Sequence, residues 1–84
     1  MEKYLIYQYE IDQGILVARL LSASNLMAAD RSGTSDPYVI FVINGVKVYQ
    51  SEVIKKTLNP VWKNQEFSTV IVSHFTLVTV DEII

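Results

Sequence analysis

Residues 30–39 read D-R-S-G-T-S-D-P-Y-V, and this stretch decides the fold. It completes a polar segment from Ser24 to Asp36, which is too long for a hairpin turn and is often functional at such a length. Pro37 suits the first position of a strand, where no ladder hydrogen bond needs an N–H. Residues 38–43 are β-branched or aromatic and predict that strand. The sequence therefore predicts a long loop that leads directly into a strand.

Period-two alternation of apolar and polar residues extends on both sides of this stretch. Asn44-Gly45 is the strongest hairpin signal, because a type I′ turn needs positive φ at both central positions. Asp12-Gln13-Gly14 predicts a second turn. We expect strands at residues 5–11, 15–22, 38–43, 46–54, 62–72 and 75–80, with Ser73-His74 separating the last two. Antiparallel strands with alternating faces predict an all-β fold of two packed sheets.

Composition excludes several classes of function. The chain has 84 residues, which is room for a single domain, and a net charge of −2 gives no global basic field to attract nucleic acid. The absence of cysteine excludes disulfides and thiolate metal sites. No apolar run approaches the roughly 20 residues of a membrane span, and Met1 to Glu10 does not have the pattern of a signal peptide.

Two separate motifs carry a family resemblance. The run L-L-S-A-S-N-L at Leu20–Leu26, followed by A-A-D-R-S-G-T-S-D-P-Y-V, resembles the second strand, first loop and third strand of C2 domains. The run K-K-T-L-N-P-V-W-K-N-Q-E-F at Lys55–Phe67 resembles the loop and strand after the basic strand of that family. With Tyr9 and Gly14 ahead of I-L-V-A-R-L, the order looks most like the synaptotagmin, rabphilin and piccolo type.

The resemblance covers residues 4 to 81 and implies an antiparallel two-sheet Greek-key β-sandwich over a single domain, 1–84. Relative to the family, the last two strands and the third loop are missing. Trp62 matches a core aromatic of the family. The resemblance also implies a cytoplasmic module that docks peripherally on membranes.

Calcium is the cofactor that the resemblance implies. Asp30 and Asp36 match the two first-loop calcium ligands of the family, and the carbonyl of Ala29 matches a backbone ligand. Asp81 matches the first third-loop aspartate if one residue is deleted before it. Because calcium takes about six to eight oxygens, three carboxylates predict a weak site, toward ~10⁻⁴–10⁻³ M. The alternative is that the loop aspartates only cap turns, as aspartate commonly does.

Anionic phospholipid is the partner that the resemblance implies. Arg31, at the tip of the first loop, suits a phosphate, although a solvated loop cation is the alternative. Lys47, Lys55 and Lys56 are candidates for a basic patch, each worth about 1 kcal/mol near an anionic surface. Tyr38 matches a headgroup-contacting position, and packing within the sheet is the alternative for it.

Catalysis has no support in these residues. His74 is the only histidine, and no cysteine accompanies it to form a nucleophile–base pair. The alternative function is a protein–protein interaction module, because a sandwich that lacks its last strands exposes sheet edges. The apolar Ile83-Ile84 favours pairing with a protein partner or a homodimer through those edges.

Overall fold

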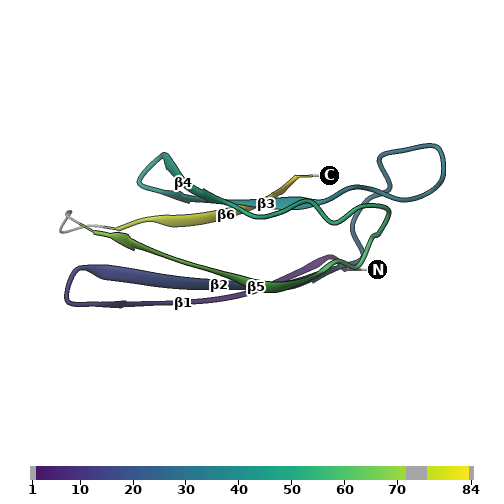
Figure 1. The fold of residues 1–84 in the computed structure, drawn as a ribbon. Helices are drawn as coiled ribbons and strands as arrows, with labels where there is room; N and C mark the ends of the chain where they lie inside the picture. Colours follow the sequence, from purple (N-terminus) through teal and green to yellow (C-terminus); the bar gives the residue numbers. More distant parts are fainter. Residues whose placement is uncertain (1, 72–75, 84) are drawn as a thin grey trace.

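The computed structural model describes residues 2–71 and 76–83, and within them the chain forms two three-stranded sheets (Figure 1). The strand orders are β1-β2-β5 and β4-β3-β6, and every neighbouring pair is antiparallel. The expected all-β sandwich is thus confirmed. The strands are β1 (Tyr4–Asp12), β2 (Ile15–Ser24), β3 (Tyr38–Ile43), β4 (Val46–Gln50), β5 (Val61–Val70) and β6 (Val78–Ile83).

Both predicted hairpin turns form. Gln13 and Gly14 have φ values of 51° and 79°, and Asn44 and Gly45 have φ values of 50° and 81°. Positive φ at both central residues is what a type I′ turn requires, and its twist matches the twist of the flanking strands. These two turns fix the registers of the β1–β2 and β3–β4 pairs.

The predicted strand 46–54 is too long, since β4 ends at Gln50. Ser51 supplies the physical reason, because its hydroxyl accepts the N–H of Val39 at 2.8 Å in place of a ladder carbonyl. The chain still follows β3 beyond that point, through bonds from Ser51 N to Val39 O and from Ile54 N to Pro37 O. A side chain therefore interrupts the regular ladder, although the two segments stay together.

The predicted strand 75–80 is displaced, since the last strand is β6 at Val78–Ile83. Asn44 sets this register, because its backbone N–H donates to Leu77 O and its side-chain Oδ1 accepts Leu77 N. Two smaller differences are that β2 continues to Ser24 and β5 covers Val61–Val70. The predicted break at Ser73-His74 and the start at Phe75 lie outside the described residues.

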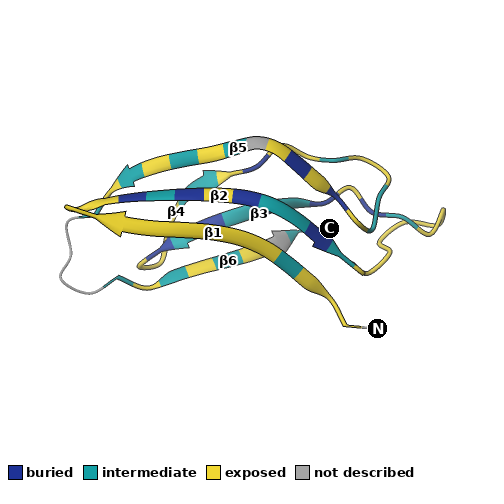
Figure 2. Cartoon of the chain, turned by 90° about the horizontal axis from the view of Figure 1, so that it is seen from below, coloured by how far each residue is buried: buried dark blue, intermediate teal, exposed yellow. Residues whose placement is uncertain are grey.

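The core lies between β2 of one sheet and β3 of the other, which Figure 2 shows as the darkest strands. Phe41 is its centre, with the Phe67 ring 5.0 Å away between centroids. Tyr49 and Phe67 stack at 4.4 Å across the β4–β5 side of the sandwich. Trp62 is buried and donates from Nε1 to Glu52 O at 3.0 Å, which agrees with its expected role in the core.

Candidate functional site

Two long loops meet at one end of the sandwich, where Figure 1 shows them at the right. They are residues 25–37, between β2 and β3, and residues 51–60, between β4 and β5. Backbone bonds join them from Thr57 N to Ser35 O at 2.9 Å and from Leu26 N to Leu58 O at 3.1 Å. We call these two segments the loop end. The predicted loop and the second motif of the sequence therefore share one surface.

Asp30 caps the tip of the first loop. Its Oδ1 accepts the backbone N–H of Ser32 at 3.0 Å, the Ser32 hydroxyl at 2.6 Å and the backbone N–H of Thr34 at 3.1 Å. Gly33, with φ of 84°, makes the tight turn that brings these donors to one oxygen. The Ser32 hydroxyl and then the Thr34 amide lower the pKa of Asp30, so its carboxylate stays ionised at neutral pH.

Ser35 holds the base of the same loop, and the sequence analysis missed it. Its side chain is 1% exposed, donates from Oγ to Met27 O at 2.6 Å and accepts Ala29 N at 2.9 Å. The peptide that leads into Asp30 is fixed by these bonds. The signal was a small hydroxyl residue within G-T-S-D-P, where a buried polar side chain needs partners.

Asp36 belongs to the first loop, but its side chain caps a backbone N–H of the second loop. Its Oδ1 accepts the backbone N–H of Lys56 at 2.9 Å, and Lys56 has a left-handed backbone with φ of 57°. Both first-loop aspartates therefore have the capping role that was the alternative to calcium binding. The second carboxylate oxygen of Asp30, Oδ2, accepts the Thr34 hydroxyl at 3.2 Å. Oδ2 of Asp36 accepts no hydrogen bond from the described part of the chain.

Asp81 lies within a strand and not in a loop. It pairs with Ile40 in the β3–β6 ladder, on the outer face of that sheet, because Val39 and Phe41 on either side of Ile40 point into the core. Among the residues that the structure describes, no three carboxylates or histidines lie close enough together to hold a metal ion. Asp30, Asp36 and Asp81 are thus not gathered into one cluster.

The fit to calcium is partial. Calcium prefers about six to eight oxygen ligands, whereas the first loop offers two carboxylates and the carbonyl of Ala29. Within the described chain that carbonyl accepts no hydrogen bond. Water or a phosphate oxygen would have to supply the remaining positions.

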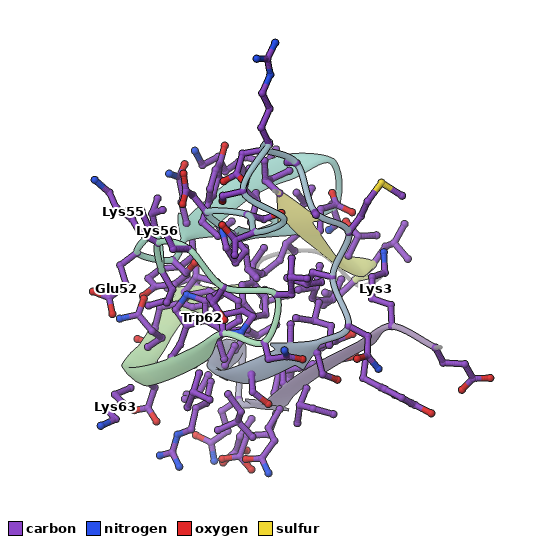
Figure 3. All side chains as sticks on the ribbon, turned by 90° about the vertical axis from the view of Figure 1, so that its right-hand side faces the viewer. Lys3, Glu52, Lys55, Lys56, Trp62 and Lys63 are labelled. Carbon is purple, nitrogen blue, oxygen red and sulfur yellow. The ribbon has the colours of Figure 1, made fainter. Side chains whose placement is uncertain are left out.

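Cationic side chains are exposed on and beside the second loop of the loop end. Figure 3 views this end directly and shows Lys55 and Lys56 on one side, with Glu52 between them and Lys63 of β5. All three lysines are exposed. Arg31 at the loop tip is also exposed and makes no hydrogen bond or ion pair with the described part of the chain. Lys63 was not among the basic residues predicted from the sequence.

Lys47 and Tyr38 occupy different parts of the β4-β3-β6 sheet. Lys47 pairs with Val42 of β3 and lies four residues before Ser51, the start of the second loop, so its Cα is about 13 Å along β4 from the loop end, and its side chain donates to Gln50 Oε1. Tyr38 opens β3 next to the loop end and is half-buried on the outer face. The structure thus separates Lys47 from Lys55 and Lys56 and keeps Tyr38 near them.

Comparison with known proteins gives the family. The C2 domain model matches residues 14–81.

This chain belongs to the C2 domain family. C2 domains are membrane- and lipid-binding modules, and they are not typically enzymes.

Individual relatives match shorter stretches. The chain is 52% identical over 48 residues to Multiple C2 and transmembrane domain-containing protein 2 of Mus musculus, and 49% identical over 51 residues to Tricalbin-3 of Saccharomyces cerevisiae. It is 49% identical over 55 residues to Multiple C2 and transmembrane domain-containing protein 1 of Homo sapiens. These matches cover 57%, 61% and 66% of this C2 domain, but only 6%, 3% and 5% of the relatives. No helix in the described part of the C2 domain is long and apolar enough to cross a membrane.

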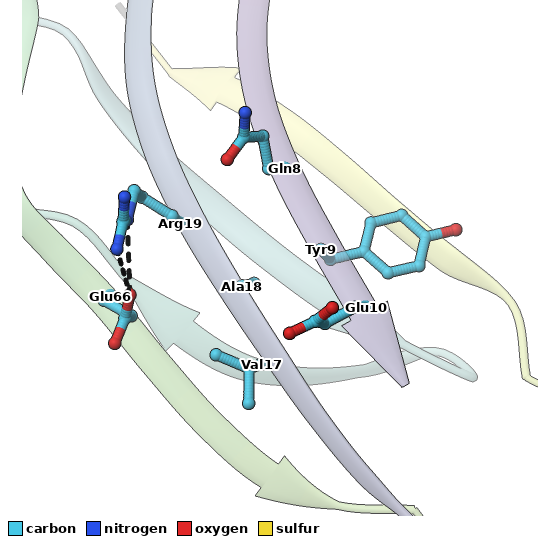
Figure 4. Close-up of a pocket in the computed structure, with 7 residues that line it drawn as sticks. All are labelled: Gln8, Tyr9, Glu10, Val17, Ala18, Arg19 and Glu66. Carbon is cyan, nitrogen blue, oxygen red and sulfur yellow. Dashed lines mark hydrogen bonds and ion pairs between the residues drawn. The ribbon is translucent and has the colours of Figure 1, made fainter. Parts of the chain in front are cut away.

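A shallow hollow of about 240 Å³ lies on the outer face of the β1-β2-β5 sheet of the C2 domain (Figure 4). Gln8, Arg19 and Glu66 form a row across its three strands. Arg19 donates from both Nε and Nη2 to Glu66 Oε2, at 3.2 and 2.8 Å. Because the guanidinium already has a carboxylate partner, this hollow offers less to an anion than the loop end does.

Proposed function

We propose that this C2 domain docks peripherally on anionic phospholipid with its loop end toward the membrane. The observation that supports this is the bond from Lys56 N to Asp36 Oδ1, which joins the two loops and leaves the Lys55 and Lys56 side chains exposed. Arg31 adds a third cation at the loop tip. With a net charge of −2, attraction to an anionic surface has to be local, and each such cation contributes about 1 kcal/mol.

Tyr38 borders the same surface and is proposed to contact the headgroup region with its ring edge. Lys47 is proposed as a secondary contact on the outer face of the β4-β3-β6 sheet, since four residues of β4 separate it from Ser51 at the loop end. The module is proposed to act by binding and not by catalysis, at the cytoplasmic face of a membrane.

Calcium is proposed as a weak, assisting ion. Its ligands would be the carboxylates of Asp30 and Asp36 and the carbonyl of Ala29, with phosphate oxygens of the lipid completing the shell. The lowered pKa of Asp30 supports this, because an ionised carboxylate is the form that binds a cation. Asp81 could join them only if β6 moved relative to β3, because the present register holds it opposite Ile40.

The test is sedimentation with phosphatidylserine-containing vesicles, with calcium and with chelator. The double variant Lys55→Gln/Lys56→Gln should weaken binding about 30-fold, as expected for a loss of about 2 kcal/mol. Lys47→Gln removes the same kind of charge elsewhere and should have the smaller effect. If Lys47→Gln weakens binding more than the double variant does, the loop end is not the docking surface. Wild-type protein that stays in the supernatant under both conditions would refute lipid docking altogether.

The second candidate function is protein interaction through sheet edges. The observation that supports it is that β1 and β6 are end strands of their sheets, with no described strand beyond either one. Unpaired edges present N–H and C=O groups that can pair with another chain. Light scattering over a concentration series tests it, and a protein that remains monomeric throughout counts against it.

A further inference from the structure

The backbone of Glu52, in the second loop of the loop end, is held by neighbouring side chains. Its carbonyl oxygen accepts the Trp62 Nε1–H at 3.0 Å and the Ser51 hydroxyl at 2.9 Å. Its N–H donates to Gln65 Oε1 at 3.0 Å. Because Trp62 and Ser51 are themselves buried, these bonds tie the start of the second loop to β5. The point at which the Glu52 side chain leaves the backbone is therefore fixed.

The carboxylate of Glu52, in contrast, makes no hydrogen bond or ion pair within the described part of the chain. Figure 3 shows this side chain between Lys55 of the second loop and Lys63 of β5. The hydrogen bonds agree with this view, because the Glu52 backbone contacts Trp62 and Gln65, which lie on either side of Lys63 in the sequence. All three charged side chains are exposed, so each can contact a ligand.

Charges of opposite sign thus alternate along this edge of the loop end. Lys55 is positive, Glu52 negative and Lys63 positive. A surface that only attracted negative charge would gain nothing from a carboxylate at its centre, because like charges repel. Glu52 weakens the attraction for a headgroup that carries negative charge alone, and it favours a headgroup that also carries a positive group.

We propose that Glu52 makes the loop end selective for the headgroup of phosphatidylserine. That headgroup carries a phosphate, then an ammonium and a carboxylate, so its charges alternate in the opposite sense to those of Lys55, Glu52 and Lys63. Glu52 accepts hydrogen bonds from the ammonium, and the two lysines donate to the phosphate and the carboxylate. This inference rests on the proposed lipid docking and names the lipid.

Phosphatidylglycerol provides the comparison that isolates Glu52. It has the same net charge as phosphatidylserine, but its headgroup contains hydroxyl groups and no ammonium. General attraction between the cations of the loop end and an anionic surface is therefore the same for both lipids. A difference in binding reports on recognition of the headgroup.

The test is sedimentation with vesicles that contain equal mole fractions of either phosphatidylserine or phosphatidylglycerol in phosphatidylcholine. The wild type should bind the phosphatidylserine vesicles about two- to fivefold more tightly, as expected for one exposed ion pair. Glu52→Gln should abolish this preference and bind phosphatidylglycerol vesicles more tightly than the wild type does, because a repelling charge is gone. Variant and wild type are compared both in chelator and in calcium, so that any effect of calcium on headgroup choice cancels.

Glu10→Gln is the matched control. Glu10 is exposed on β1, opposite Val17 and two residues before the end of the strand at Asp12, away from the loop end. Its loss removes the same charge and should leave the preference of the wild type unchanged.

Two results would overturn this inference and leave lipid docking intact. They are equal binding of the wild type to both kinds of vesicle, and a Glu52→Gln variant that keeps the preference. A wild-type protein that stays in the supernatant with both kinds of vesicle, in chelator and in calcium, refutes lipid docking and this inference with it.

Discussion

The backbone N–H of Lys56 donates to Oδ1 of Asp36 at 2.9 Å, and this bond joins the two loops of the loop end. Lys56 has a positive φ of 57°, a conformation that a non-glycine residue adopts at some cost unless its surroundings hold it. The carboxylate of Asp36 is the partner that holds it. One residue thus sets the position of Lys55 and Lys56 and is also a proposed calcium ligand.

Two substitutions at position 36 separate these roles. Asp36→Asn keeps an acceptor for Lys56 N but removes the charge, so the loop should keep its conformation while calcium-dependent vesicle binding is lost. Asp36→Ala removes both, so it should also destabilise the loop, by about 0.5–2 kcal/mol as for other lost side-chain caps. Urea unfolding and vesicle sedimentation with and without calcium measure the two effects.

The capping role is wrong if Asp36→Ala is as stable as Asp36→Asn. The calcium role is wrong if Asp36→Asn binds vesicles as tightly as the wild type in the presence of calcium. Because Asp36 is exposed, the smaller alanine side chain loses little packing, and a difference between the two variants reports mainly on the acceptor.

Asp30 predicts a pH dependence of the loop tip. The Ser32 hydroxyl and the Thr34 amide lower its pKa below the ordinary value of 3.8. A group whose pKa is lowered by folding adds stability that is present above the unfolded value and is lost as the pH falls through the lowered one. The stability difference between wild type and Asp30→Asn should therefore persist at neutral pH, decline as the pH falls below 3.8, and vanish once the pH is below the lowered pKa of the folded state. Thermal midpoints across that range measure it, and a difference independent of pH would exclude the carboxylate as its source.

The short turn signals of the sequence predict the β1–β2 and β3–β4 hairpins well. Asn44-Gly45 predicts its turn because local backbone chemistry alone decides it. The end of β4 was not predictable in this way, since it depends on the Ser51 hydroxyl meeting Val39 across the sheet. The start of β6 likewise depends on Asn44 bonding to Leu77, which is 33 residues away.

The candidate site residues divide in the same way, into those that a local motif positions and those that a distant contact positions. The two loop aspartates lie on the same loop because one short motif carries them. Asp81 does not join them because its placement depends on the strand register, which residue spacing does not reveal.

Ser35 is expected to be the most sensitive polar residue of the first loop. Ser35→Ala removes the donor to Met27 O and one of the two acceptors of Ala29 N in a buried position. Loss of a buried partner costs about 1–3 kcal/mol, which urea unfolding would measure. Ser68→Ala is the matched control, since Ser68 is exposed on β5 and its loss should change stability by about 0.5 kcal/mol or less. Equal effects of the two substitutions would mean that Ser35 does not hold the loop.

Phe41 should be the most costly side chain to remove. Phe41 is 1% exposed, and its ring contacts those of Tyr7, Tyr49 and Phe67. These contacts link β3 to β1 and β5 of the other sheet and to β4 of its own sheet. Phe41→Ala should cost about 3–5 kcal/mol, because the surrounding rings can close only part of the cavity.

A domain of this size has a total stability of about 4–13 kcal/mol, so the Phe41→Ala variant should be close to unfolded at 37 °C. Calorimetry or urea unfolding at lower temperature would measure the change. Val70→Ala provides the comparison, because an exposed valine on β5 has little packing to lose. If Phe41→Ala lost no more stability than Val70→Ala, the two sheets could not be held together by the ring cluster around Phe41.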